Sequence, residues 1–536
     1  MLPPPIPILT RLGIAPERIR QMPPGSRCTY CRAIINWLTR YPSSQNNKSN
    51  NNLEQVKGYL EAFYHLCDMQ EWERAFSLVS VRLNTPTQEP FHYQLKFWGY
   101  GQVRIELYKA LTERAKHTAE DGWNARILQF LGESYYSSGQ YSQAKNYYER
   151  SLAMFKRVGE PGDVGMLMGA LGDVYYAQGQ YDKAIAHQKE WLVIAQQDRA
   201  RFAEGIALGS LGNIYESKGD YPKAIAYHQQ HLAIAQETND LEMEGAALGN
   251  LGSCYHSLNQ YDKAKNYHKQ HLELAQKIGN RQGESNALGG IGSALYNLCD
   301  YAKAKAYFLQ QRDIAKEIGD LAGEASALGG LGNVCFSLEK YKDAISFHKQ
   351  HLAIAKTTGN RRSQLHALGN LGNVYNATAD YSKAADYYQQ QLAIAQSIGD
   401  RLGEAIAHGN LGIIAYEQED YENAYRAMSQ QLKLAVEMCD RLRIAQALGN
   451  LGNVYSVRGE YMKAKKHYQQ ALSIAESVGD GQTIANTLGY LGALHTQLEN
   501  RVISTDYYQQ QLDLATVIGD RLGVKRATAG LGKAKE

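Results

Sequence analysis

Hydrophobic residues recur along this chain at helical spacing, in units of constant length. Within one unit, the apolar side chains of Leu208, Leu211 and Ile214 share one face of a predicted helix over residues 202–218. After a Gly-Asp turn, a second apolar stripe predicts another helix over residues 222–238. One such helical hairpin has too little core to be stable alone, so neighbouring hairpins are expected to stack.

Glycine marks the same position of every unit. Successive glycines lie 40 residues apart at 132, 172, 212, 252, 292, 332, 372, 412, 452, 492 and 532. Tyrosine recurs with the same period from Tyr141 to Tyr461, and alanine follows each tyrosine three residues later. Between units, a glycine supplies a left-handed helix stop, and the Asp or Asn after it is a good N-cap. A fixed period of this length predicts an all-α solenoid of antiparallel helix pairs.

The pattern also predicts the order of the segments. The tenth unit is degenerate, because Arg501 and Ser504 replace the recurring tyrosine and alanine. The last predicted helix is rich in lysine and is expected to cap the array. The expected segments are a Pro-rich and then helical segment (1–42), a flexible polar linker (43–52), degenerate repeat-like helices (53–121), ten 40-residue units (122–520) and a capping helix (521–536).

Composition narrows the class of protein. The net charge of +3 lacks the strongly basic character of a nucleic-acid-binding protein. No stretch approaches 18 consecutive apolar residues, so no membrane span is expected, and the N-terminus does not resemble a secretory signal. Seven cysteines, mostly isolated, argue against a disulfide framework and favour a cytoplasmic location.

The amino-acid sequences of the units resemble those of a known family. The stretches LGNLGNVY (368–375), DYSKAADYYQQQLAIA (380–395) and GDRLGEA (399–405) resemble the 40-residue tetratricopeptide repeats (TPRs) of the Pins/LGN adaptor family. The resemblance implies a right-handed superhelix whose concave face, lined by the first helix of each unit, binds extended segments of signalling proteins. That family's Gα-binding motifs do not occur in this sequence, so coupling to G proteins is not expected. Residues 53–115 also resemble the start of TPR arrays in long bacterial signalling proteins, some of which carry an NTPase module.

Asparagines provide the candidate binding site. They occupy two positions of the predicted first helix, three residues apart and therefore on one face. A carboxamide offers an acceptor and two donors, so it can pair with the backbone of a bound peptide whatever the peptide's sequence. The alternative is that these amides bond neighbouring helices or face water. The predicted peptide-binding residues are Asn213, Asn250, Asn333, Asn370, Asn373, Asn410, Asn450 and Asn453.

Glycine pairs in mid-helix, such as Gly369 and Gly372, are unfavourable there and need a reason. Close helix packing accounts for the second glycine of each pair. The first is open to two interpretations, close packing or room for a ligand backbone.

Candidate chemistry is otherwise weak. A single CxxC at Cys28 and Cys31 lacks the second pair that a zinc site needs, and the tail GLGK (530–533) lacks the other features of a phosphate loop. Three histidine pairs have metal-compatible spacing, but no third ligand is expected beside them, so packing is their predicted role. These pairs are His228/His231, His268/His271 and His348/His351. The sequence predicts no catalytic residue, no metal and no cofactor.

These observations predict a protein–protein interaction adaptor that binds extended peptides in its groove. One alternative is a regulatory subunit of a signalling complex whose NTPase or effector is a separate chain. Another is nucleic-acid binding in the groove, which the low net charge disfavours. The identity and charge preference of the partner stay open, as does self-association.

Overall fold

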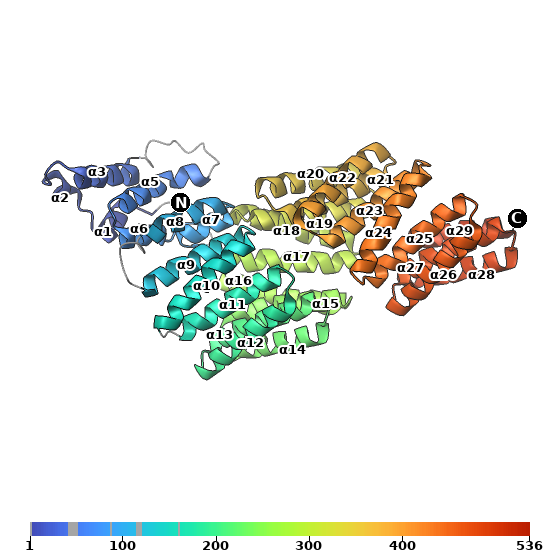
Figure 1. Ribbon diagram of the computed structural model, residues 1–536, viewed down its shortest axis with the longest axis horizontal. Coiled ribbons are helices and arrows are strands. Elements are labelled where there is room, and N and C mark those ends of the chain that lie inside the picture. The colour runs from blue at the N-terminus through green and yellow to red at the C-terminus, as the bar shows by residue number, and fades with distance from the viewer. Residues whose placement is uncertain (1–2, 41–51, 86–87, 114–120, 159–160, 536) are drawn as a thin grey trace. The chain divides into compact units, whose positions relative to one another are not determined.

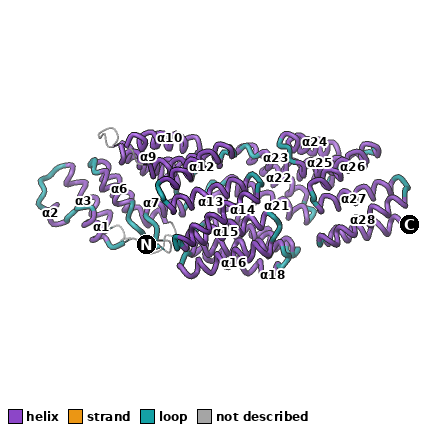
Figure 2. Tube along the Cα trace, turned by 90° about the horizontal axis from the view of Figure 1, so that it is seen from below, coloured by secondary structure: helices purple, strands orange, loops and turns teal. Residues whose placement is uncertain are grey.

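The computed structural model describes residues 3–40, 52–85, 88–113, 121–158 and 161–535 (Figure 1). Throughout these ranges the regular structure is helical, and no strand occurs (Figure 2). The one β-type contact in the same ranges is an isolated bridge between Arg82 and Pro90. The predicted all-α fold of tandem helix pairs is therefore confirmed.

The chain divides into two compact units, Met1–Val334 and Cys335–Glu536, and the boundary falls within helix α19 (Leu321–Ser337). The N-terminal unit begins with shorter, irregular helices, followed by regular helix pairs. Its helices are α1 (Pro5–Arg11), α2 (Pro16–Arg20), α3 (Ser26–Thr39), α5 (Asn52–Asp68), α6 (Trp72–Val79), α7 (Phe91–Phe97), α8 (Gly101–Thr112), α9 (Asp121–Ser137), α10 (Tyr141–Val158), α11 (Pro161–Ala177), α12 (Tyr181–Gln197), α13 (Arg201–Ser217), α14 (Tyr221–Glu237), α15 (Leu241–Ser257), α16 (Tyr261–Ile278), α17 (Arg281–Asn297) and α18 (Tyr301–Ile318).

The C-terminal unit contains helix pairs of the same kind. Its helices are α20 (Tyr341–Thr357), α21 (Arg361–Ala377), α22 (Tyr381–Ile398), α23 (Arg401–Glu417), α24 (Tyr421–Glu437), α25 (Arg441–Val457), α26 (Tyr461–Val478), α27 (Gly481–Gln497), α28 (Arg501–Ile518) and α29 (Arg521–Lys535). From α9 onward we call the odd-numbered helices A helices and the even-numbered helices B helices. Each B helix follows its A helix in one repeat.

Helix ends follow the chemistry of the turns between repeats. The carboxylate of Asp240 accepts a hydrogen bond from the backbone N–H of Met243 at 2.9 Å, which caps α15. Asp400 caps α23 in the same way through the N–H of Gly403. Gly279 ends α16 in the left-handed region, at φ 70°.

Small and aromatic residues hold the two helices of a repeat together. The recurring alanine of the B helix, represented by Ala224 and Ala384, is fully buried. A tyrosine of the A helix stacks on a ring of the B helix, as Tyr215 does on Tyr227 with ring centroids 5.4 Å apart. The same stacking recurs at Tyr375 and Tyr387. Many of the repeats thus have a small contact and an aromatic contact at fixed positions, although Leu295, Cys335 and Ala415 replace the A-helix ring in three of them.

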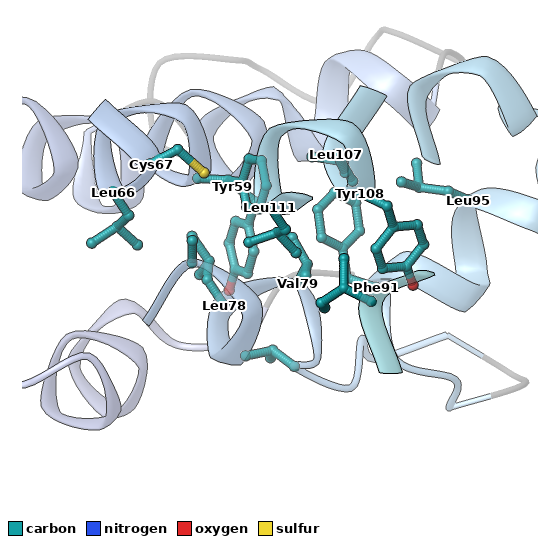
Figure 3. Close-up of a cluster of buried hydrophobic side chains, with 14 of the residues drawn as sticks. Tyr59, Leu66, Cys67, Leu78, Val79, Phe91, Leu95, Leu107, Tyr108 and Leu111 are labelled. Atoms are coloured by element: carbon teal, nitrogen blue, oxygen red, sulfur yellow. The ribbon is translucent and has the colours of Figure 1, made fainter. Parts of the chain in front are cut away.

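The N-terminal helices form a core of a different composition. Tyr59 of α5 packs edge-on against Phe91 of α7, with their ring centroids 5.9 Å apart (Figure 3). Leu78 of α6 and Leu111 of α8 are fully buried in the same cluster. This core lacks the 40-residue pattern, which explains why only the degenerate repeat wording appeared in the sequence.

Two predicted segments need comment. Residues 1–42 were expected to be Pro-rich first and helical only afterwards, but the Pro-rich part is itself helical. Helices α1 and α2 each begin with a proline, because proline is tolerated in the first helical turn. Of the predicted linker, residues 43–51 lie outside the described residues, and Asn52 already begins α5.

No helix within the described ranges combines the length and apolar character needed to cross a membrane.

Candidate functional site

A pocket of about 370 Å³ lies on the A helices of three consecutive repeats in the C-terminal unit. Helices α23, α25 and α27 supply nearly all of its lining, and Gln431 of α24 completes it. The lining residues are Ile406, Gly409, Asn410, Ile413, Gln431, Arg443, Ala445, Gln446, Gly449, Asn450, Asp480, Gln482, Thr483, Asn486, Thr487 and Tyr490. Amides and hydroxyls alternate here with apolar side chains, so the pocket can hydrogen-bond and bury a ligand at once.

The pocket lies where one side chain of the repeat is missing. In most repeats the first mid-helix glycine faces a long B-helix side chain: a Cβ on Gly409 would lie 2.6 Å from Nε2 of Gln431. Gly449 differs because the corresponding B-helix residue is Ala471, which is too short to fill the space. A Cβ on Gly449 would meet only the ring of Tyr490, at 3.7 Å.

This pattern decides between the two interpretations of the first glycine. At Gly209 and Gly369, the space is taken by His231 and Gln391 of the same repeat, so the alternative of room for a ligand backbone is wrong there. Packing also accounts for the second glycine, since the ring of Tyr388 lies against Gly372. Gly449 is the position where the A helix opens onto the pocket.

Two of the predicted asparagines lie together in this pocket. Asn410 of α23 and Asn450 of α25 occupy the same position of consecutive repeats and are half-buried. Neither side chain has a hydrogen-bond partner among the described residues. In the next repeat Tyr490 takes this position, and Asn486, one turn earlier on α27, supplies a third amide to the lining. Sequence reasoning missed Asn486 because it lies outside the two recurring asparagine positions.

The second asparagine position has a different local role. The hydroxyl of Tyr388 donates to Oδ1 of Asn373 at 2.7 Å, and Tyr468 bonds Asn453 at the same distance. These oxygens join the A helix to the B helix of their own repeat, as the packing alternative supposed. Each amide keeps its NH₂ group for other partners.

The remaining predicted asparagines lie outside the pocket. Asn370 of the C-terminal unit is half-buried. In the N-terminal unit, Asn213 is exposed, while Asn250 and Asn333 are half-buried. The structure therefore brings two of the eight predicted residues into one pocket.

The pocket contains one residue of each charge. Nη1 of Arg443 donates to Oε1 of Gln446 at 2.9 Å, which holds the guanidinium along α25. The carboxylate of Asp480 caps α27 by accepting from the N–H of Thr483 at 2.9 Å. With its formal charges balanced, the lining does not have the basic character that phosphate groups require.

The predicted histidine pairs are buried in the repeats. His228 and His348 lie beneath the second glycine position, and burial lowers the pKa of each to about 4. These rings are neutral in the fold and act mainly as packing groups. The expectation that no further ligand lies beside them is wrong for His228, because Glu216 and Cys254 lie next to it. The signal was present in the sequence as two residues that break the repeat, but their spacings of 12 and 26 do not suggest a cluster.

The CxxC cysteines are buried on α3. The thiol of Cys28 donates to the carbonyl of Ile19 at 3.8 Å, and burial raises the pKa of Cys31. Neither belongs to a metal-compatible cluster within the described part of the chain.

Comparison with known proteins bears on the repeats. A family model described as tetratricopeptide repeat matches six segments, which together span well over half of the chain. The segments are 123–197, 163–237, 203–277, 283–357, 363–435 and 443–516. No curated protein matches the chain significantly.

Several solved structures are similar at low sequence identity. One is a signal transduction ATPase with a tetratricopeptide repeat sensor from Pyrococcus horikoshii (14% identity, 88% of this chain and 72% of that chain, TM-score 0.46). Another is the apo form of the quorum sensor NprR from B. thuringiensis (14% identity, 72% and 99%, TM-score 0.45). A third is a putative kinesin light chain from Podospora anserina (18% identity, 35% and 93%, TM-score 0.30).

Proposed function

Since the chain belongs to the tetratricopeptide repeat family, we propose that it is a protein-interaction adaptor that binds extended peptide segments along its A helices. The observation that carries this proposal is the pocket over α23, α25 and α27, in which Asn410 and Asn450 have no hydrogen-bond partner among the described residues. Half-buried amides that face a pocket without a protein partner are available to hydrogen-bond a ligand.

The spacing of the amides suits an extended backbone. Packed helices lie about 10 Å apart, and three residues of an extended chain cover about the same distance. A peptide crossing the A helices would therefore place one backbone amide group against each asparagine, about three residues apart. Gly449 directly precedes Asn450 and has no side chain, so the peptide backbone can approach α25 there.

The recurring asparagines of the C-terminal unit form a row along its A helices and provide the residues of the proposed site. Asn410 and Asn450 bind the peptide backbone, and Asn370 extends the row by one repeat. Asn373 and Asn453 contribute through their NH₂ groups, since their oxygens already accept from tyrosines. In the N-terminal unit, Asn213, Asn250 and Asn333 are the corresponding proposed residues.

A displayed library of random dodecapeptides provides a ligand without knowledge of the natural partner. Peptides selected on the full chain are then titrated against two variants, the double change Asn410→Ala with Asn450→Ala, and Gly449→Ala. The double change removes two backbone partners at about 1–3 kcal/mol each, so we expect binding to weaken at least tenfold. Gly449→Ala narrows the pocket and should also weaken binding, although alanine favours the helix.

A matched control separates binding from folding. The double change Asn373→Ala with Asn453→Ala removes the same chemical groups at the second asparagine position, where the proposed share in binding is only the NH₂ group, and it also breaks two bonds to tyrosine. We expect it to lower the melting temperature while affecting peptide affinity less than the pocket pair. If the pocket variants bind the selected peptides as tightly as the unmodified chain, the proposed site is wrong.

The salt dependence of binding distinguishes a peptide-binding groove from a nucleic-acid-binding groove. A groove that binds phosphates loses affinity steeply as salt rises, whereas amide-to-backbone bonds do not. Binding of the selected peptides should change little between 50 and 200 mM salt, a range over which phosphate contacts lose about 10³-fold or more.

A further inference from the structure

Three side chains that commonly bind metals meet between consecutive helices of the N-terminal unit. Glu216 extends from α13, His228 from α14 and Cys254 from α15. A carboxylate oxygen, an imidazole nitrogen and the thiol sulfur all lie within 4.8 Å of one another. Ligand atoms around a tetrahedral zinc ion are separated by about 3.3–3.8 Å, given bond lengths of about 2.0–2.3 Å. The three atoms must therefore move together by about 1 Å or less to reach that separation.

His228 lacks the partners that a buried imidazole needs. Its side chain is fully buried, and neither ring nitrogen has a hydrogen-bond partner among the described residues. A neutral imidazole carries one donor and one acceptor, and leaving either of them without a partner in a buried site is unfavourable. His268 and His348 occupy the same position in other repeats, and each has only one such nitrogen. The geometry at His228 therefore leaves a nitrogen available to a ligand.

The two neighbours of His228 are a carboxyl group and a thiol, and no cationic side chain among the described residues pairs with them. The carboxylate of Glu216 accepts a hydrogen bond from the Ser257 hydroxyl at 3.4 Å, and the thiol of Cys254 lies within 4.8 Å of it. Burial, and then the nearby carboxylate, raises the pKa of Cys254 to about 12, and burial raises the pKa of Glu216. Among the described residues, no lysine or arginine pairs with Glu216. A bound divalent cation would compensate both groups.

The repeat architecture shows that this chemistry is specific to one place. At the position of Glu216, other repeats have Tyr or Phe, such as Tyr176 or Tyr296, or an uncharged polar residue or histidine, and none has another carboxylate. At the position of Cys254, other repeats have an aliphatic residue, such as Val174 or Val374. Both departures from the pattern fall on helices that pack against the same histidine. Packing alone would be served by the residues that the other repeats use.

We propose that Glu216, His228 and Cys254 bind one zinc ion, with water in the fourth position. Sulfur and nitrogen ligands select a borderline transition metal over calcium or magnesium. Binding replaces the thiol proton by the metal, so one proton leaves for each ion bound at neutral pH. Glu216 is only half-buried, which gives the ion a route from the surface to His228 and Cys254.

The ion would join two repeats. Glu216 and His228 belong to one repeat, and Cys254 belongs to the next. A metal that binds the folded state but not the unfolded state raises the free energy of unfolding, and the increase grows with metal concentration. The fold does not depend on the ion, because the other repeats hold together without this set of ligands.

The test uses the full chain after chelator treatment and dialysis. Zinc titration by calorimetry should give one site per chain, and Co²⁺ should give the absorption band of a cobalt–thiolate bond. Binding should strengthen with rising pH, because the thiol must lose its proton. Calcium and magnesium should not compete. A chain that binds no zinc stoichiometrically, or binds cobalt without the thiolate band, would overturn the proposal.

Variants taken from other repeats keep the fold while removing the ligands. Cys254→Val and Glu216→Tyr introduce residues that the array already has at these positions. We expect Cys254→Val to abolish the thiolate band, and each change to weaken zinc binding at least 100-fold, with the circular dichroism spectrum unchanged. His348→Tyr is the matched control: it alters the same repeat position where Phe336 and Val374 offer no ligands, so binding should not change. Equal zinc affinity in Cys254→Val and the unmodified chain would contradict the site.

Discussion

At the scale of single residues, the repeated glycines are best understood through the side chains that face them. The ring of Tyr388 lies against Gly372, and its hydroxyl reaches Asn373 on the same helix. Gly449 faces only Tyr490, at ordinary van der Waals distance. Two glycines of similar sequence context therefore have opposite tolerance for a side chain.

Gly372→Ala should destabilise the protein. The added Cβ would overlap the Tyr388 ring, so the ring must move and its bond to Asn373 is strained or lost. Such overpacking costs about 1–3 kcal/mol. Gly449→Ala is the control and should be neutral or stabilising by up to about 1 kcal/mol, because alanine favours a helix interior. In thermal melts, Gly372→Ala should lower the melting temperature and Gly449→Ala should leave it unchanged or raise it. Equal shifts of the two variants would contradict this account of the glycines.

Buried histidines should make the fold sensitive to acid. Burial lowers the pKa of His231, His268, His348 and His351 to about 4, from an unfolded value of about 6.5. Between pH 6.5 and 4 these histidines bind protons in the unfolded chain but stay neutral in the folded chain. The free energy of unfolding therefore falls as pH drops from 6.5 to 4. Asp173 acts in the opposite sense, because burial raises its pKa to about 7. Its protonated form fits the fold, so the stability of the folded state falls as pH rises from about 4 to 7 and the unfolded chain loses this proton first.

The histidine effect should dominate because several residues contribute to it. Melting temperatures measured between pH 4 and 7.5 on chelator-treated protein should therefore decrease toward acid. The double change His348→Tyr with His351→Gln uses residues found at these positions in other repeats and should flatten the decrease. Asp173→Asn should instead stabilise the protein near pH 8 and have little effect at pH 4. A melting temperature that rises toward acid would contradict this assignment.

At the scale of helices and turns, the repeat period predicted most of what the structure shows. The helices expected over 202–218 and 222–238 are α13 (Arg201–Ser217) and α14 (Tyr221–Glu237). Helix boundaries depend on local capping and periodicity, which a sequence states directly. The pocket at Gly449 depends on which B-helix side chain occupies the space beside the first glycine of the repeat. That the short side chain of Ala471 leaves this space open is visible only in the structure. The cluster at His228 depends on three helices meeting, which no local pattern encodes.

Turns show a second limit of the pattern. Glycine was expected to provide the left-handed residue between repeats, and it does so at Gly399 with φ 69°. Other turns use residues with a side chain in the same conformation, such as Cys439 at φ 55° and Asn239 at φ 53°. The stacking of the helices fixes the turn, and the local residue adapts to it at some cost.

Cys439→Gly should therefore stabilise the turn between α24 and α25. Relief of the left-handed conformation is worth about 1 kcal/mol, reduced by the greater freedom of glycine in the unfolded chain. Cys439 is exposed, so no packing is lost. The reverse change, Gly399→Ala, should cost about 1 kcal/mol. A melting temperature that falls in Cys439→Gly would show that the turn is not strained.

At the scale of whole units, the N-terminal unit contains a contact that nearest-neighbour stacking does not explain. Trp98 follows α7 and is buried, and a Cβ on Gly319 would lie 3.6 Å from its Cδ1. Ile318, at the end of α18, is only 4% exposed, whereas Ile278 and Ile398 at the same repeat position are 38% and 39% exposed. The irregular N-terminal helices thus cover the turn between α18 and α19. In a simple solenoid each repeat contacts only its neighbours, so this contact adds a long-range constraint within the unit.

Trp98→Ala should loosen that turn without unfolding the repeats around it. Backbone bonding at the turn is ordinary, since the N–H of Asp320 donates to the carbonyl of Ala315 at 2.8 Å, and the equivalent bond from Asp400 is 2.9 Å. The turn also receives a hydrogen bond from Gln282 to Asp320 at 2.8 Å, so the protection that the tryptophan adds is the part lost in Trp98→Ala. By hydrogen exchange, these amides should exchange about tenfold more slowly than those at 399 and 400 in the unmodified chain, and at a similar rate in Trp98→Ala. If the amides at 319 and 320 exchange at the same rate in Trp98→Ala as in the unmodified chain, the indole covers the turn without stabilising it. The N-terminal unit would then behave as a simple nearest-neighbour array.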